Sequence, residues 1–215
     1  MTRTSCHPLR RCLREPIAEI EEASRLLAEA AAAHLAGNRA AVVALLEASN
    51  LPSVRAWTES IWGKKGEFAV RGPYDSDPPV HRLEKARMPS LSLQKQLHAE
   101  GGYYCRFCGI PVVRREVREF FRKTYPEAKL WGTKNLEQHA ALQCMWAQYD
   151  HVVPHARGGS NDSSNLVVTC APCNYGRMKY TLKEAGLEDP RNYPPRAGPW
   201  AGLEEVLSEP LRNEA

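Results

Sequence analysis

Two C-x-x-C pairs constrain the fold of this chain more than any other feature. They are Cys105 with Cys108, and Cys170 with Cys173. Two residues between thiolates allow a tight turn to direct both sulfurs at one ion, and two such turns complete a tetrahedral four-sulfur zinc site. The 61 residues from 109 to 169 separate the pairs, far more than the ~15–20 of a simple ribbon. The spacing therefore predicts a structural zinc site that clamps an inserted helical segment.

The same cysteines have two other interpretations, as reduced buried thiols or as an iron site of the rubredoxin or iron–sulfur kind. A Cys₂His₂ finger that pairs Cys105 and Cys108 with His151 and His155 is excluded, because the 42 residues from 109 to 150 far exceed the spacing of a finger. The other thiols belong to Cys6, Cys12 and Cys144. Cys144 lies on an apolar stretch, which favours a small buried hydrophobe.

Composition sets the class of protein. The chain has 215 residues, 43% of them hydrophobic, enough for one compact domain with flanking segments. No apolar run approaches the ~18 residues of a membrane span, and residues 1–16 lack the apolar stretch of a secretory signal. Seven cysteines without an export signal indicate a reducing, cytoplasmic setting. The net charge of +4 permits nucleic acid as a partner, and the richness in Ala and Arg favours a bacterial or phage source.

Three regions are expected. Residues 1–90 form a helical N-terminal region, with helices over 17–35 and 39–48 and a Pro- and Gly-containing linker near 72–90. These helices either pack on the main domain or form a dimer or partner interface. Residues 91–186 form the main domain, with further helices over 91–99, 113–124, 135–145 and 175–185. Residues 187–215, rich in Pro and acidic, are expected to be loosely ordered, with one short helix near 202–207.

The predicted helix over 113–124 carries five basic side chains against two acidic ones. Such a run is either a solvated helix face or a face that lies along the phosphates of a nucleic acid. The basic residues are Arg114, Arg115, Arg118, Arg122 and Lys123.

The stretch 147–174 contains candidate catalytic and metal-binding residues. Two β-rich runs, 147–153 and 165–169, flank an 11-residue connection (154–164) rich in Gly, Ser, Asn and Asp, which predicts a hairpin with a long loop. The second strand leads directly into the second cysteine pair and a helix. Asp150 and Asn174 offer the carboxylate and amide oxygens that suit Mg²⁺. His151 follows Asp150 in the strand and therefore projects from the opposite face, unless a twist or bulge distorts the strand there.

The order D-H-V-V-P-x-x-x-G-G, N-L-V and C-x-x-C-N resembles the HNH endonuclease family over residues 105–181. The resemblance implies an α+β fold: a ββα-metal nuclease core with zinc knuckles, an inserted helical segment and the helical N-terminal region. It implies that Asp150 and Asn174 hold a catalytic Mg²⁺ or other divalent cation and that His151 is the general base. Asn165 would brace the loop and so orient His151, and Arg177 would hold a phosphate.

The expected function is metal-dependent hydrolysis of phosphodiester bonds, most simply in double-stranded DNA, with 5′-phosphate and 3′-hydroxyl products. Arg177 and Arg157 would position the phosphate electrostatically. Two other functions stay open from the sequence. One is a non-catalytic zinc-ribbon module that binds nucleic acid, and the other is an interaction protein with a decayed nuclease core. Neither explains why an acid, an imidazole and two amides follow the order of an HNH unit.

Overall fold

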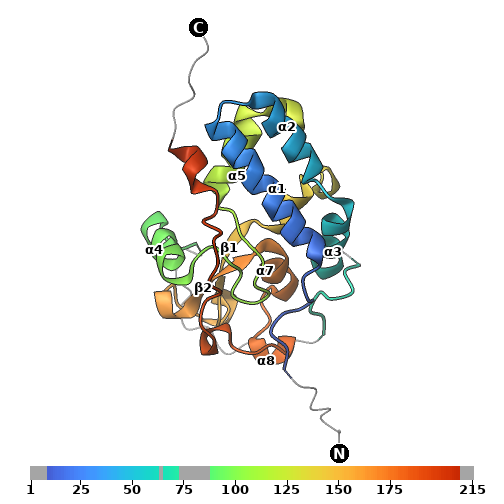
Figure 1. Ribbon diagram of the computed structural model, residues 1–215. Helices are drawn as coiled ribbons and strands as arrows, with labels where there is room; N and C mark the ends of the chain where they lie inside the picture. Colours follow the sequence, from blue (N-terminus) through green and yellow to red (C-terminus); the bar gives the residue numbers. More distant parts are fainter. Residues whose placement is uncertain (1–8, 63–64, 73–87, 209–215) are drawn as a thin grey trace, which may run out of the picture.

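The computed structural model describes residues 9–62, 65–72 and 88–208, and it combines helices with one two-stranded antiparallel sheet (Figure 1). This mixture agrees with an α+β class. No helix in the described ranges is long and apolar enough to cross a membrane. The elements are α1 (Ala18–Leu35), α2 (Arg39–Ala48), α3 (Pro52–Trp62), α4 (Leu91–Gly101), α5 (Arg115–Thr124), α6 (Ala140–Cys144), β1 (Ala147–His151), β2 (Leu166–Cys170), α7 (Ala171–Arg177) and α8 (Leu182–Ala185), with short 3-10 turns between them.

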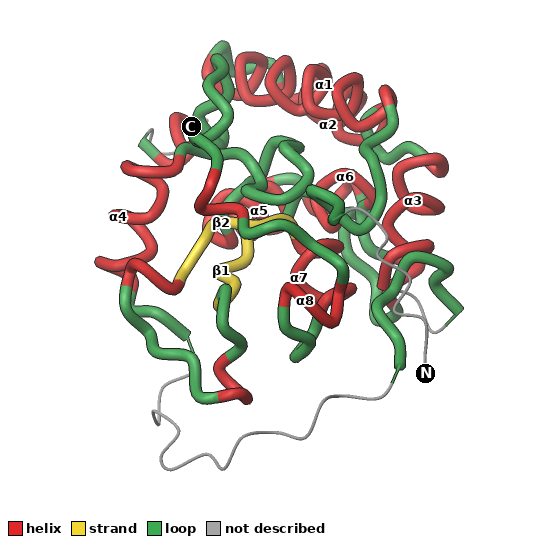
Figure 2. The backbone as a smooth tube through the Cα atoms, turned by 90° about the horizontal axis from the view of Figure 1, so that it is seen from below, coloured by secondary structure: helices red, strands yellow, loops and turns green. Residues whose placement is uncertain are grey.

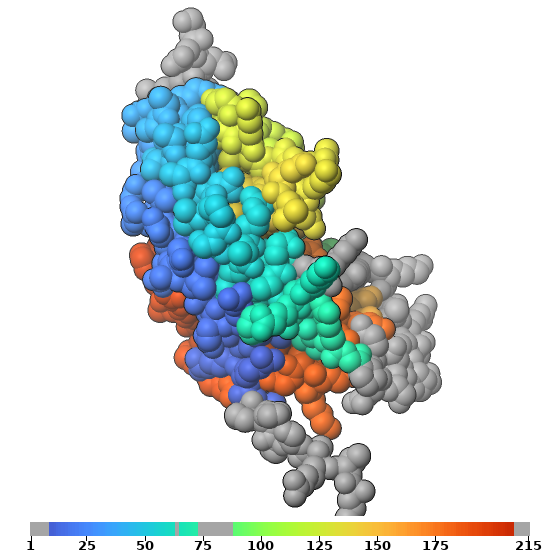
Figure 3. All heavy atoms as spheres, turned by 90° about the vertical axis from the view of Figure 1, so that its right-hand side faces the viewer, coloured from blue at the N-terminus to red at the C-terminus, as the bar shows by residue number. Residues whose placement is uncertain are grey.

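Helices α1 and α2 form the N-terminal hairpin that the sequence predicts. Helix α1 is free of Gly and Pro, and its Ile20 and Leu27 are fully buried. Asn38 begins α2 by accepting a hydrogen bond from the Ala41 N–H at 3.1 Å. The apolar faces join one hydrophobic cluster that continues to the C-terminal part of the chain. Figure 3 shows these helices packed against the segment coloured yellow, so the N-terminal region shares its core with the rest.

Helix α3 was not expected from the sequence. It packs directly against α7, the helix that follows β2. Trp57 and Ile61 are buried on its inner face. A Cβ atom at Gly176 of α7 would lie 2.5 Å from Ile61 and 2.7 Å from Leu13. Only a glycine therefore allows α7 to approach α3 so closely.

Two predicted helices are interrupted. The expected helix over 135–145 is a 3-10 turn followed by α6, because the His139 ring accepts a hydrogen bond from the Leu142 N–H at 3.2 Å and starts a new helix. The expected helix over 175–185 begins earlier, in α7, and stops where Met178 takes a φ of 53°. Thr181 then begins α8 through a capping box with Glu184.

The sheet places the predicted Asp-His pair at its end. Strands β1 and β2 are antiparallel, with Asp150 opposite Val167 and His151 opposite Leu166. Strand β2 continues directly into α7. Figure 2 shows the two strands between α4 on one side and α7 with α8 on the other. The hairpin and the helix after it are the ββα order that the sequence predicts.

The C-terminal segment is not loosely ordered as far as the structure describes it. Arg106 donates to the Pro190 and Tyr193 carbonyls, both at 2.6 Å. Trp200 donates from its indole to the Val112 carbonyl at 2.8 Å, and Val206 is fully buried. The Pro-rich composition suggested a free tail, but its few apolar residues are enough to attach 187–208 to the core. Residues 209–215, and most of the predicted linker (73–87), lie outside the described residues.

The free energy of unfolding is expected to fall between pH 6.5 and pH 4 because of two buried histidines. Burial lowers the pKa of His139 and of His98 to about 4. Each ring is therefore neutral in the folded chain. Its contribution to the free energy of unfolding is complete above pH 6.5, and it is lost at lower pH because the unfolded chain binds the proton that the folded chain excludes. For fully buried His139 this amounts to ~3 kcal/mol over the window. Urea unfolding at pH 7 and pH 4.5 measures it, and His139→Asn should remove about half of the dependence. An unchanged pH dependence would contradict the assignment.

Candidate functional site

The four predicted cysteines meet at one point. The Sγ atoms of Cys105, Cys108, Cys170 and Cys173 all lie within 4.8 Å of one another, and the Cys108 and Cys170 sulfurs are 3.6 Å apart. A tetrahedral ion with sulfurs at ~2.3 Å requires sulfur–sulfur distances near 3.8 Å. The cluster therefore has the size of a four-thiolate site, and all four thiols are free rather than paired as disulfides.

Local turns and one long-range bond build the cluster. The first pair is closed by hydrogen bonds from the Cys105 N–H to the Ile110 carbonyl and from the Gly109 N–H to the Cys105 carbonyl. Gly109 has a φ of 75°, a conformation that favours glycine. The Arg106 N–H donates to the Val168 carbonyl and attaches this turn to β2. The second pair lies at the start of α7, so a metal here would fix the first turn to the ββα unit.

The chemistry of the four thiols suits a metal. Burial raises the pKa of the Cys108 and Cys170 thiols, and hydrogen bonds within the cluster raise that of Cys173. At Cys105, burial is outweighed by hydrogen bonds from the other three thiols, which hold its pKa well below its usual range. A thiolate is the form that binds zinc. Cys144 is fully buried outside the cluster, and burial raises the pKa of its thiol. Cys6 lies outside the described residues.

Asp150 is paired with Arg177 in the interior. Arg177 Nη2 lies 2.6 Å from Asp150 Oδ1, and Arg177 Nε lies 3.0 Å from Asp150 Oδ2. The same guanidinium donates to the His151, Val152 and Tyr180 carbonyls. Arg177 is fully buried, and Asp150 is 5% exposed. Burial raises the pKa of Asp150 more than the adjacent Arg177 lowers it.

This pairing corrects the phosphate role expected for Arg177. All its N–H groups face acceptors of the chain, and the side chain does not reach the surface. Its charge alone suggests a phosphate ligand, whereas the fold directs the guanidinium at a carboxylate and three carbonyls. Arg177 therefore fixes the position of Asp150 and of the backbone at the end of β1.

His151 faces the other side of the strand. Its Nε2 lies 2.7 Å from Asn161 Oδ1. Because a carbonyl oxygen only accepts, Nε2 carries the proton in this contact and Nδ1 keeps a free lone pair. The His155 ring packs edge-on at 5.4 Å between centroids. His151 is 6% exposed. The imidazole is thus held in one orientation by the long loop after β1.

Asn165 braces that loop. Its Oδ1 accepts from the Val153 N–H at 2.9 Å, and its Nδ2 donates to the Val153 and Ser160 carbonyls at 3.1 and 2.9 Å. A Cβ at Gly159 would lie 1.8 Å from the Val153 carbonyl oxygen. The second glycine of the G-G pair is therefore needed so that the loop can return to β1 beside the Asn165 side chain.

Asn174 lies on α7 one turn before Arg177 and on the same face. Its Nδ2 donates to Gln148 Oε1 at 3.5 Å, and the neighbouring Tyr175 hydroxyl donates to the same oxygen at 3.4 Å. Gln148 and Asp150 are two residues apart in β1 and share a face of the strand. The β1–α7 interface therefore lines up one carboxylate and two amides, all oxygen donors.

The contacts of Asp150, His151 and Asn174 divide between the two faces of β1. Asp150 and Asn174 lie toward α7, whereas His151 lies toward the loop, as the strand alternation predicts. Among the described residues, the four cysteines are the one group of three or more His, Cys, Asp or Glu side chains close enough to hold a metal. The side-chain oxygens of Asp150, Asn174 and Gln148 suit a hard cation such as Mg²⁺. However, Arg177 already balances the charge of Asp150. A cation can use only the carboxylate lone pairs that face away from Arg177.

Arg157 also differs from its expected role. Its Nη2 lies 2.7 Å from Glu184 Oε1, and both side chains are at least nine-tenths buried. Glu184 also accepts from Thr181 at the start of α8. Arg157 therefore attaches the loop after β1 to α8 instead of contacting a phosphate.

The basic helix α5 does not present a continuous basic face. Arg114 is buried and pairs with Glu116 at 2.9 Å and with Glu204 at 3.2 Å. Arg118 is buried beside two tryptophans. Arg122 pairs with Glu119 at 2.6 Å, which leaves Arg115 and Lys123 as its exposed basic residues.

Sequence reasoning missed three residues that shape the site. Asn161 holds the His151 ring, Gln148 holds the Asn174 amide, and Glu184 holds Arg157. Asn161 lies in a loop rich in Gly, Ser, Asn and Asp, and nothing in the sequence distinguishes it from its polar neighbours. Gln148 could have been found from its spacing, because it lies two residues before Asp150 on the same strand face.

The comparison with known protein families agrees with this geometry. A model described as HNH endonuclease matches residues 145–186, the segment that contains β1, the braced loop, β2, the second cysteine pair and α7. No curated protein and no solved structure matches the chain. Residues 145–186 are therefore similar to the HNH endonuclease family.

Proposed function

We propose that the protein is a metal-dependent endonuclease that hydrolyses phosphodiester bonds of nucleic acid, with DNA as the expected substrate. The family match to residues 145–186 supports a nuclease in general. The observation that carries the more specific proposal is the state of His151, whose ring is held by Asn161 in a loop that Asn165 braces.

His151 is the general base of the proposal. With Nε2 donating to Asn161, the Nδ1 lone pair can take a proton from the attacking water. Asn161 fixes the tautomer, and the backbone bonds of Asn165 keep the loop in place. Both therefore act as positioning residues.

Asp150 and Asn174 would hold a divalent cation, with Gln148 beside them. Such a cation supplies charge neutralisation at the scissile phosphate and the leaving oxygen. Arg177 holds the Asp150 carboxylate in one orientation from the protein side. Because Arg177 also neutralises that carboxylate, we expect weak cation binding to the free protein and stronger binding with the phosphate present. The four-cysteine cluster would hold a separate structural zinc, which has no vacant position for catalysis.

Replacing Asn174 by Ala is expected to reduce Mg²⁺-dependent cleavage ~10- to 100-fold, because an oxygen donor next to the proposed cation is lost. The half-buried side chain makes one long contact at 3.5 Å, so the fold should tolerate the change. Initial rates over a Mg²⁺ titration measure the effect, and zinc content should remain at one equivalent. Asn192→Ala, an exposed residue outside the site, is the control and should leave both unchanged. Equal rates for the two variants would remove Asn174 from the proposed cation site.

Incubation of supercoiled plasmid with the purified protein tests the function itself. We expect nicked or linear product with Mg²⁺ or Mn²⁺ and none with EDTA, while the structural metal, bound by four buried thiolates, stays in place. Product ends should be 5′-phosphate and 3′-hydroxyl. Binding of DNA without cleavage under every metal condition would contradict the proposal.

That contrary result would favour the second candidate, a non-catalytic zinc-ribbon module that binds nucleic acid. The observation in its favour is the buried Asp150–Arg177 pair, which leaves little free charge for a cation. The Asn161 and Asn165 contacts around His151 favour the enzyme, because a module that only binds has no need for an oriented imidazole.

A further inference from the structure

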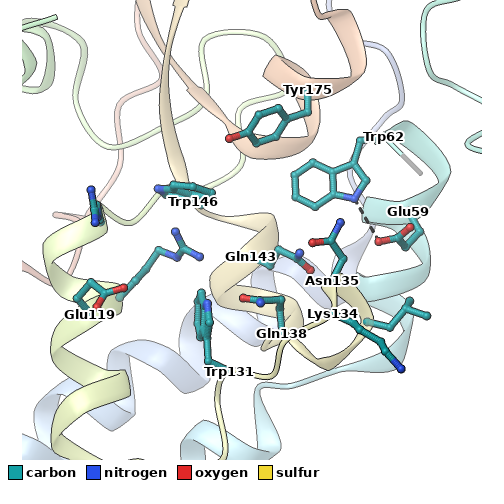
Figure 4. A pocket seen from close by; sticks show the side chains of 13 residues that line it. Glu59, Trp62, Glu119, Trp131, Lys134, Asn135, Gln138, Gln143, Trp146 and Tyr175 are labelled. Atoms are coloured by element: carbon teal, nitrogen blue, oxygen red, sulfur yellow. Dashed lines mark hydrogen bonds between the residues drawn. The ribbon is translucent and has the colours of Figure 1, made fainter. Parts of the chain in front are cut away.

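A cavity of about 1110 Å³ opens beside the ββα unit, and none of the proposed catalytic or metal-binding residues lines it. Its walls include three indoles and a phenol, those of Trp62, Trp131, Trp146 and Tyr175 (Figure 4). These side chains come from α3, α7 and the chain between α5 and β1. A cavity of this size is in the range of small-ligand sites, and its aromatic content suits a planar ligand.

The rings of Trp62, Trp146 and Tyr175 meet edge-on or tilted instead of stacking on one another. Tyr175 meets Trp62 at 5.3 Å between centroids with an interplanar angle of 62°, and it meets Trp146 at 6.3 Å with an angle of 53°. Figure 4 shows Trp146, Trp62 and Tyr175 around the same opening, with the amides of Gln143 and Asn135 between them. The opening thus combines aromatic faces with hydrogen-bonding amides.

Arg118 is the unusual member of the cavity wall. Its guanidinium carbon lies 4.1 Å from the Trp146 ring centroid and 4.6 Å from that of Trp131. The residue is 6% exposed, and its Nε has no hydrogen-bond partner. Burial lowers the pKa of Arg118 to about 9, so the side chain is still a cation at neutral pH. No described residue accepts a hydrogen bond from this guanidinium, and an unsatisfied buried donor requires an explanation.

The cavity adjoins the proposed cleavage site. Tyr175 is the residue after Asn174 in α7, and both donate to Gln148 Oε1. Arg115 of α5 and Lys134 also line the cavity, together with the carboxylates of Glu59 and Glu119. A polyanion bound across Asn174 would therefore pass directly over the opening.

We propose that this cavity binds an unpaired base of the nucleic-acid substrate, next to the phosphate that the protein cleaves. The inference rests on the proposed nuclease function and extends it to the substrate. A base stacks on indole faces, and its carbonyl oxygens accept from Arg118. An apolar ligand would leave Arg118 without an acceptor, and a cationic ligand would be repelled by it. A free phosphate would make no use of the aromatic faces.

The consequence is a preference for locally opened nucleic acid. A base inside a regular duplex is stacked and paired, so extracting it costs free energy that a bulged base does not require. Substrates with one unpaired base should therefore bind more tightly than fully paired duplex of the same sequence.

Fluorescence anisotropy of the full, zinc-loaded chain in EDTA tests the preference without cleavage. The probes are a labelled duplex with a single-base bulge and the same duplex fully paired. We expect ~10-fold tighter binding of the bulged probe, the contribution of one stacked base. Trp131→Leu should abolish this difference and leave binding of the paired probe unchanged, whereas Trp131→Phe should retain most of it. Arg118→Met should weaken bulge binding in the same way.

Arg39→Met is the matched control, because Arg39 also lies over an aromatic ring, 4.9 Å from the centroid of Tyr125, but away from the cavity. It should leave the difference intact. Equal affinity for both probes, or an unaltered difference in Trp131→Leu, would overturn the proposal. So would full displacement of the bulged probe by free deoxyguanosine monophosphate, which would indicate a mononucleotide site. Cleavage with Mg²⁺ is measured on the same preparation, so a binding preference without cleavage contradicts only the nuclease proposal.

Discussion

His151→Ala is expected to reduce plasmid cleavage by ~10²- to 10⁴-fold, the usual contribution of a general base. The ring makes one side-chain hydrogen bond, to Asn161, and packs on His155. Its removal should therefore leave the zinc content and the far-UV circular dichroism spectrum unchanged. Initial rates at saturating Mg²⁺ measure the loss.

Added imidazole should restore part of the activity of His151→Ala, because the small base can occupy the space of the lost ring. His155→Ala is the comparison variant, since the two rings are 5.4 Å apart. We expect it to retain most of the activity. If His155→Ala is inactive and His151→Ala is not, the general base is the neighbouring imidazole and the assignment is wrong.

Cys170→Ser is expected to abolish folding rather than activity alone. Cys170 is fully buried and begins α7, and its sulfur is 3.6 Å from that of Cys108. Structural zinc contributes ~10 kcal/mol or more to folding, as large as the total stability of most domains. We expect a zinc-free, protease-sensitive protein. Plasma emission spectrometry of the parent protein also separates zinc from iron.

Cys144→Ala is the matched control. This thiol is equally buried but lies outside the four-sulfur cluster. It should keep one equivalent of zinc and lose only ~1 kcal/mol, as for most single substitutions. A soluble Cys170→Ser protein with the melting temperature of the parent and no metal would show that the cluster is not a structural metal site.

Features encoded over short distances in the sequence were predicted well. Each C-x-x-C turn needs only its own residues, so the pairs could be recognised without the fold. The alternation along 147–151 placed Asp150 and His151 on opposite faces of the strand, and the structure does so. The order of strand, loop, strand and helix followed from the turn-forming residues between the two β-rich runs.

The roles of the charged residues were predicted less well. Arg177, Arg157 and Arg114 were all expected on the surface near phosphate, and all three are buried in ion pairs. Their partners are 27, 27 and 90 positions away in the sequence. Residue type shows that a side chain carries a charge, but only the packing of distant segments shows which opposite charge it meets.

The amino-acid sequence alone determined the four-sulfur cluster, the hairpin with its helix and the similarity of residues 145–186 to HNH endonucleases, because short-range spacing encodes each of them. Tertiary structure decided which cations stay available for a ligand. Arg177 forms an ion pair with Asp150, whereas Arg118 is buried beside two indoles and has no hydrogen-bond acceptor among the described residues. The reason is that burying a charge is costly unless a partner is present, and the position of that partner depends on how the whole chain packs.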